Sequence, residues 1–104
     1  MTRKVSIHEA AENEINEAAD FYDLECPGLG TVFLDEIEFS IKRILQFPDS
    51  SPILKGRVRM MVLRKFPYSV AYSVLPSEIR LLAVAHTVNL FLNEHPLKSR
   101  KYDY

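Results

Sequence analysis

Residues 57–86 contain three runs of strand-forming residues separated by two short turns, and this pattern limits the fold more than any other part of the chain. Each turn contains a proline, Pro67 or Pro76, which interrupts strand pairing. Side chains two residues apart in a strand lie on the same face. In the second run this places on one face Tyr68, Val70, Tyr72 and Val74, and in the third run Leu82, Val84 and His86. The pattern predicts an antiparallel meander that carries basic residues and ends at a titratable histidine.

The chain has the size of one domain, and we expect residues 1–104 to fold as a single unit. Apolar residues make up 47% and charged residues 26%, which excludes a disordered or fibrous chain. The single cysteine, Cys26, excludes an internal disulfide and fits a reducing compartment. No apolar run is long enough to span a membrane, and the N-terminus lacks the apolar segment of a signal peptide. The expected location is therefore the cytoplasm.

The net charge of −1 hides a difference between the two halves of the chain. Residues 1–52 hold four basic and eleven acidic residues, a net of −7, whereas residues 53–104 hold nine and three, a net of +6. Solvated faces are the ordinary explanation of such charges, and we interpret the carboxylates Glu14 and Glu17 in this way. Tyrosines are interleaved with the positive charges of the second half, which favours a polyanionic partner there.

Residues 3–7 predict a short strand that leads directly into a helix. Ser6 and Glu9 match a capping box at the start of this helix. Apolar side chains then recur at helical spacing as far as Tyr22, and Pro27 disfavours a helical conformation at the residue before it. The first helix therefore ends close to this proline.

A second helix is predicted from about Leu29 to Phe47, with residues 49–56 forming the loop that leads to the meander. Because only a few residues separate the two helices, we expect an antiparallel hairpin packed against one face of the sheet. The predicted fold class is α+β, a small antiparallel sheet with an N-terminal helical hairpin, in the order β-α-α-β-β-β.

The tail, residues 87–104, fits two structures. Residues 88–92 either extend the last strand or begin a short amphipathic helix, and Pro96 ends either one. Basic and aromatic residues follow: Lys98, Arg100, Lys101, Tyr102 and Tyr104.

The order of these elements and several motifs resemble the RelE/ParE superfamily of bacterial toxins from type II toxin–antitoxin operons. The likeness covers about residues 3–86. It includes Pro-Gly-Leu-Gly between the helices, Arg-Lys-Phe-Pro-Tyr at the first turn of the meander, and Leu-Leu-Ala-Val-Ala-His at its end. The chain is most similar to the ParE-like, or plasmid stabilisation, branch. This resemblance implies a toxin with a cognate antitoxin protein as its partner.

The resemblance implies three alternative activities. ParE-like toxins bind DNA gyrase, and this is the mechanism we favour. RelE-like toxins are ribosome-dependent endoribonucleases that cut mRNA, which is the first alternative. Relatives commonly follow the strand-end histidine with arginines, a proline and an aromatic pair, whereas residues 87–92 depart from that pattern. The second alternative is therefore an attenuated toxin that only binds its antitoxin.

Each alternative has candidate site residues. Cleavage of mRNA by a ribose 2′-oxygen needs proton transfer and cations near the phosphate. Histidine is a common proton-transfer residue, which makes His86 the candidate for that role, and Arg59 and Lys65 carry positive charge. Binding to a target needs no catalytic group, and its candidates are Arg57, Arg59, Lys65, Lys98, Arg100, Lys101 and Tyr102. The candidates for contact with the antitoxin are Leu90, Phe91 and Leu92.

No motif indicates a cofactor or a metal. The histidines and Cys26 lack the spacing of a zinc site. Gly28-Leu29-Gly30 is too short for a dinucleotide-binding loop. We therefore expect neither.

Overall fold

The computed structural model describes residues 3–92 and 94–96, in which helices and strands follow one another in the order β1, α1, α2, β2, β3, β4, β5, α3. The strands are β1 Lys4–Ile7, β2 Ile53–Lys55, β3 Val58–Val62, β4 Tyr68–Val74 and β5 Glu78–His86. The helices are α1 Glu9–Glu25, α2 Leu29–Gln46 and α3 Thr87–Phe91. The predicted hairpin and meander are confirmed, β2 lies inside the predicted loop, and the segment after the meander adopts the helical alternative.

The five strands form one sheet in the order β1-β5-β4-β3-β2. Strands β3, β4 and β5 pair antiparallel as predicted, and β2 adds a short antiparallel edge. Strand β1 pairs parallel with β5, so that Lys4 lies beside Glu78 and Ile7 beside Leu81. The fold class is α+β as predicted, with a mixed sheet in place of a purely antiparallel one.

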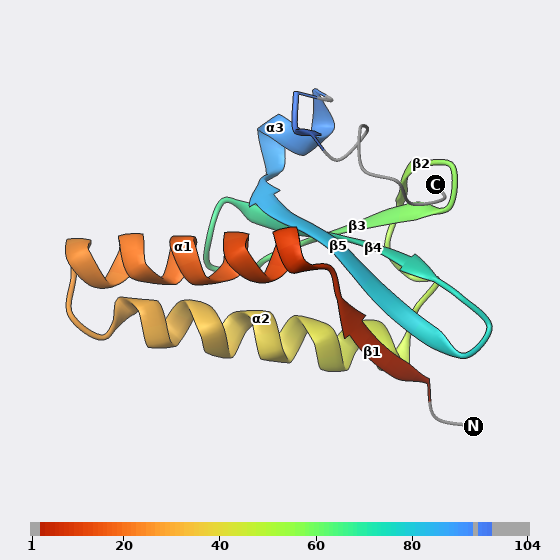
Figure 1. Ribbon diagram of the computed structural model, residues 1–104, viewed down its shortest axis with the longest axis horizontal. Helices are drawn as coiled ribbons and strands as arrows, with labels where there is room; N and C mark the ends of the chain where they lie inside the picture. Colours follow the sequence, from red (N-terminus) through yellow and green to blue (C-terminus); the bar gives the residue numbers. More distant parts are fainter. Residues whose placement is uncertain (1–2, 93, 97–104) are drawn as a thin grey trace.

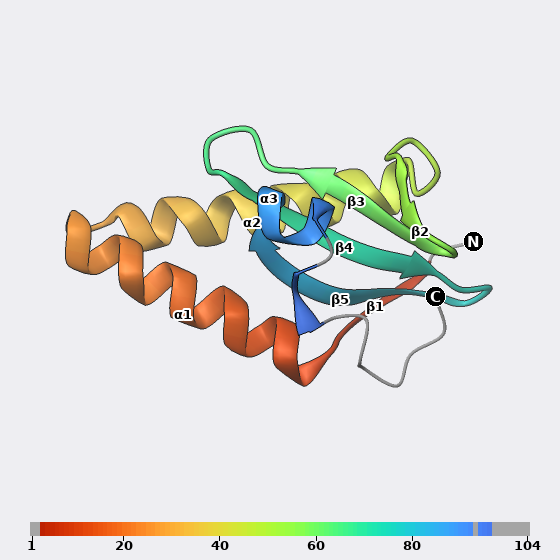
Figure 2. The same ribbon diagram turned by 90° about the horizontal axis from the view of Figure 1, so that it is seen from above.

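The α1–α2 hairpin lies against one face of the sheet, and α3 lies toward the opposite face (Figure 1). Seen from above, α3 lies over β4 and β5, on the side away from the hairpin (Figure 2). The main core fills the space between the hairpin and the sheet, and a smaller apolar cluster lies under α3.

Aromatic rings form the centre of the main core. Phe33 of α2 is fully buried, and its ring centroid lies 5.1 Å from that of Phe66 and 5.3 Å from that of Tyr68. Tyr22 of α1 joins the cluster, 4.8 Å from Phe66. Burying a side chain such as Phe33 contributes about 1.5–3 kcal/mol. The β4 face predicted from alternation, from Tyr68 to Val74, contacts this core.

A β-bulge interrupts the alternation of β5. Ala83 pairs with Ala71 and Leu81 pairs with Tyr72, so the register between β4 and β5 shifts by one residue at Leu82. Leu81 and Val84 belong to the main core, whereas Leu82 packs in the cluster under α3. The prediction that Leu82 shares a face with Val84 and His86 is therefore wrong, because the extra residue shifts the alternation by one.

The capping box predicted at the start of α1 is also wrong. Strand β1 continues through Ile7, and the hydroxyl of Ser6 bonds to the carboxylate of Glu78 instead of capping the helix. His8 is the capping residue, and its Nδ1 accepts a hydrogen bond from the amide of Ala10 at 2.9 Å. The parallel pairing with β5 keeps Ser6 extended in the sheet and so moves the cap by two residues.

Two glycines shape the turn between α1 and α2. Gly28 precedes α2 with a φ of 92°, a left-handed conformation that glycine adopts without strain. Gly30 lies so close to α1 that a Cβ atom there would be 2.4 Å from the carbonyl oxygen of Ala19. Its amide donates to Asp23 Oδ1 at 2.7 Å, which holds the two helices together at the turn.

Candidate functional site

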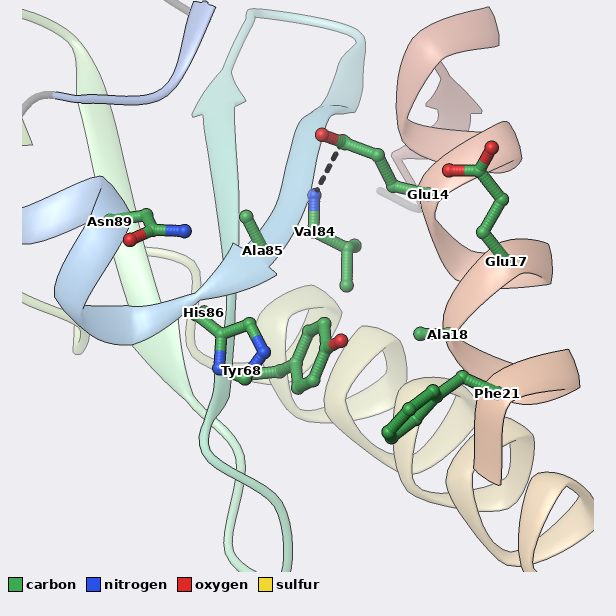
Figure 3. Close-up of a pocket in the computed structure, with 9 residues that line it drawn as sticks. All are labelled: Glu14, Glu17, Ala18, Phe21, Tyr68, Val84, Ala85, His86 and Asn89. Atoms are coloured by element: carbon green, nitrogen blue, oxygen red, sulfur yellow. Dashed lines mark hydrogen bonds between the residues drawn. The ribbon is translucent and has the colours of Figure 1, made fainter. Parts of the chain in front are cut away.

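An open pocket of about 380 Å³ lies between α1, the end of β5 and α3. Glu14, Glu17, Ala18 and Phe21 line it from α1, since residues three, four and seven positions apart share one face of a helix. The opposite wall is formed by Tyr68, Val84, Ala85, His86 and Asn89 (Figure 3). Among the candidate site residues that the structure describes, only His86 belongs to this pocket.

His86 is exposed where β5 passes into α3. Its imidazole lies against the ring of Tyr68, with the ring centroids 4.4 Å apart and the planes tilted by 35°. Burial raises the pKa of Tyr68 above its ordinary value of 10. The phenol therefore stays protonated at neutral pH and acts as a ring surface and a hydrogen-bond donor rather than as a base.

Glu14 fastens three segments around the pocket. Its Oε1 accepts a hydrogen bond from the amide of Val84 at 3.1 Å, at a point where β5 has passed beyond the end of β1. Its Oε2 contacts Nε2 of His95, which is buried. The carboxylate that the sequence suggested was merely solvated thus holds α1, β5 and the segment after α3 together.

Arg59 lies away from this pocket and contacts its own chain. Its guanidinium donates to the backbone carbonyls of Asp49 at 3.1 Å and Ser51 at 2.7 Å, and lies 3.7 Å from the carboxylate of Asp49. The hydroxyl of Tyr72, directly opposite Arg59 on β4, donates to the carbonyl of Pro48 at 2.9 Å. Together these bonds fasten the loop after α2 to the sheet.

The three candidate catalytic residues are not brought together. Arg59 is in register with Tyr72, whereas His86 is in register with Tyr68. Four residues of strand separate these positions, which is about 14 Å at roughly 3.4 Å per residue. Lys65 is exposed in the turn after β3, at the His86 end of the sheet. The structure therefore separates Arg59 from His86.

The other candidates occupy different surroundings. Arg57 lines a second pocket, of about 310 Å³, together with Arg59, Asp49 and Ile53. Leu90 is the buried residue of α3 and belongs to the smaller apolar cluster, while Phe91 and Leu92 are 71% and 56% exposed. The remaining candidates lie outside the described residues: Lys98, Arg100, Lys101 and Tyr102.

Arg64 makes contacts that the sequence gave no reason to expect. Its backbone amide donates to Oε2 of the buried Glu36 at 2.7 Å, and its Nε lies 3.5 Å from the same oxygen. The guanidinium lies 4.0 Å from the centroid of the Phe39 ring. These contacts fasten the turn after β3 to α2. The sequence places Glu36 and Phe39 three residues apart, on one face of a helix. It does not show that their common partner, Arg64, lies in a distant turn.

Neither a metal site nor a membrane-spanning helix is present among residues 3–92 and 94–96. No three side chains of His, Cys, Asp or Glu in that part of the chain are grouped so that they could hold a metal ion. None of its helices is both long and apolar enough to cross a bilayer.

The helical hairpin on a mixed five-stranded sheet, with a histidine at the end of the last meander strand, is the arrangement expected for a toxin domain of the RelE/ParE type. None of the protein-family models matches the chain. Over 90 residues, 83% of either chain, it is 34% identical to Toxin ParE2 of two Mycobacterium tuberculosis strains, CDC 1551 / Oshkosh and ATCC 25618 / H37Rv.

A solved structure has the same fold at lower sequence identity. It is that of the chromosomal ParDE toxin–antitoxin system from P. aeruginosa, with a TM-score of 0.73 and 18% identity, covering 82% of this chain and 96% of that one. Together with the identity to Toxin ParE2, these findings place the chain in the ParE family of toxins, of the type II toxin–antitoxin class.

Proposed function

We propose that this toxin inhibits growth by binding DNA gyrase and not by cutting mRNA. The separation of Arg59 from His86 carries this proposal. A ribonuclease mechanism needs a proton-transfer group and cations around one phosphate, each within hydrogen-bond reach of it. Arg59 instead donates to backbone carbonyls of the loop after α2. A binding mechanism needs only an exposed surface, and it acts where gyrase acts, in the cytoplasm.

We further propose that a cognate antitoxin covers the surface around α3. Val88, Phe91 and Leu92 expose 63%, 71% and 56% of their surface on or next to this short helix. Clustered exposed apolar side chains indicate a surface that a partner covers. The matched structure is a ParDE system, so its toxin has a partner of this kind.

The test measures gyrase and translation separately. Purified toxin is titrated into a supercoiling reaction with gyrase and relaxed plasmid, where we expect supercoiling to fall and linear DNA to accumulate. In a gyrase-free reconstituted translation system, we expect full-length mRNA by primer extension. The His86→Ala variant serves as the matched control and should inhibit gyrase as well as the wild type does.

Either of two outcomes would contradict the proposal. Cuts in mRNA in register with codons, lost in His86→Ala, would establish a ribosome-dependent nuclease. Normal supercoiling together with normal growth during induction without antitoxin would establish an attenuated toxin whose remaining role is to bind its antitoxin.

A further inference from the structure

The pocket between α1 and β5 combines aromatic walls with a carboxylate that binds nothing in the described chain. Glu17 is exposed at the pocket, and no hydrogen bond or ion pair joins it to residues 3–92 or 94–96. Figure 3 shows Ala18 and Phe21 of α1 facing Tyr68 across the pocket. Because Ala18 is small, it leaves space between the two rings and the acid.

On the α1 side of this pocket, the charged residues are all acidic. Helix α1 has seven acidic residues and no basic one. Glu14 and Asp23 bind groups of the chain itself, the Val84 amide and the Gly30 amide. Glu17, one helical turn from Glu14, has no such bond within the described residues. A group that complements the pocket therefore carries positive charge.

Part of the rim of the pocket is apolar. Phe21 lines the pocket and is 54% exposed, and Leu24, one helical turn further along α1, is 86% exposed. On α3, Val88 is 63% exposed and is next in sequence to Asn89, which lines the pocket. A free inorganic cation would gain nothing from this rim. A basic side chain within an apolar segment of a protein complements both the carboxylate and the rim.

We propose that the pocket receives an arginine side chain of the antitoxin, flanked in that partner by apolar residues; this inference rests on the antitoxin binding proposed above. The planar guanidinium would stack against Tyr68 and Phe21 and donate to the carboxylate of Glu17. Arginine fits better than lysine, because a guanidinium stacks on rings and donates two parallel hydrogen bonds to one carboxylate. The apolar flanks would lie on α3 and on Leu24.

The pocket is tested with a small probe. The ¹⁵N-labelled full-length toxin is titrated with Nα-acetyl-arginine methylamide, and in parallel with its neutral isostere Nα-acetyl-citrulline methylamide and with the lysine analogue. We expect saturable backbone shifts at Ala18, Phe21, His86 and Asn89, with binding about tenfold tighter for arginine than for citrulline. Glu17→Gln should remove this preference. Glu12→Gln, which neutralises an exposed acid of α1 outside the pocket, should keep it.

Three results would overturn the pocket's assignment. They are the absence of saturable shifts at these residues, equal binding of arginine and citrulline analogues, and an arginine preference that survives Glu17→Gln. Equal binding of the lysine analogue would refute the stacking on Tyr68 and Phe21.

The occupant is tested by neutralisation. Cells express the toxin with its cognate antitoxin, and growth is measured for wild-type, Glu17→Arg and Glu12→Arg toxins. We expect the antitoxin to protect against the first and third but not against Glu17→Arg. Full protection against Glu17→Arg would overturn the antitoxin as the source of the arginine. The growth comparison applies to variants that arrest growth when expressed without antitoxin, and the gyrase assay, which uses free toxin, reports on the proposed function separately.

Discussion

The two ends of the meander use similar side chains in opposite ways. At one end, which we call the fixed end, Arg59 and Tyr72 bond to the carbonyls of Pro48, Asp49 and Ser51. At the other, which we call the open end, the His86 ring lies against that of Tyr68 and faces a pocket. A charged side chain that donates its hydrogen bonds to backbone carbonyls of the same chain has a structural role. An exposed side chain is available to a partner.

This difference changes the interpretation of the positive charge of the second half. Arg59 and Arg64 are both held by groups of the first half, Asp49 and Glu36. Part of the charge asymmetry between the halves is therefore neutralised within the fold. Arg57 and Lys65, which are exposed, remain candidates for contact with a polyanionic target.

The largest effect is expected from Arg59→Ala at the fixed end. The change removes two hydrogen bonds from a charged donor, and we expect the free energy of unfolding to fall by about 2–3 kcal/mol. Urea unfolding followed by circular dichroism measures it. Arg57→Ala, an exposed neighbour, is the control and should change stability by less than about 0.5 kcal/mol. Equal losses for both arginines would contradict the structural role of Arg59.

A smaller loss is expected from Tyr72→Phe. This substitution keeps the buried ring and removes only the hydroxyl that donates to Pro48, so stability should fall by about 1 kcal/mol. The same unfolding experiment measures it, with Tyr68→Phe at the open end as the control. A larger loss in Tyr68→Phe than in Tyr72→Phe would reverse the assignment of the two ends.

The half-buried tyrosines Tyr22 and Tyr68 also predict a loss of stability in alkali. Burial raises the pKa of Tyr68, and burial together with the neighbouring Tyr68 raises the pKa of Tyr22, above the ordinary value of 10. Since the unfolded chain then loses these protons first, the stabilisation is complete below pH 10 and declines as pH rises through the folded-state pKa values. Absorbance titration of phenolate and urea unfolding above pH 10 test this. Tyr68→Phe should make the decline shallower, and an unchanged slope would argue against it.

The smallest effect is expected from His86→Ala at the open end. The imidazole is exposed and contacts one ring, so stability should change by less than about 0.5 kcal/mol. Thermal unfolding measures it, beside the gyrase assay described above. A loss comparable to that of Arg59→Ala would show that the two ends do not differ in the way described.

Local patterns predicted the helices and the core face of β4 because those features depend on near neighbours in the chain. The spacing of Ile15, Ala18 and Tyr22 is enough to place one face of α1 in the core. The parallel pairing of β1 with β5 joins opposite ends of the chain, and no local signal specifies it. The same pairing moved the helix cap from Ser6 to His8.

The site was harder to predict than the fold, because its contacts depend on side-chain partners from distant elements. The sequence identified His86 and Arg59 by residue type but could not show that about 14 Å of strand separates their register positions. Glu14 and Glu17 have the same residue type on the same helix. The positions of β5 and His95 give Glu14 its structural contacts, and these positions cannot be read from the sequence. Glu17 is left available to a partner.

Because of the bulge at Leu82, the number of residues in β5 decides which face of the sheet each later side chain of the strand lies on. The extra residue places Val84 in the main core and turns Ala83 and Ala85 toward α3. A deletion of one residue here would restore strict alternation and exchange the two faces of everything that follows, so that His86 would leave Tyr68 and the pocket. Among relatives, an insertion or deletion at this point would therefore exchange the side chains that face the main core with those that face α3. Sequence alignments that ignore it would compare residues from opposite sides of the sheet.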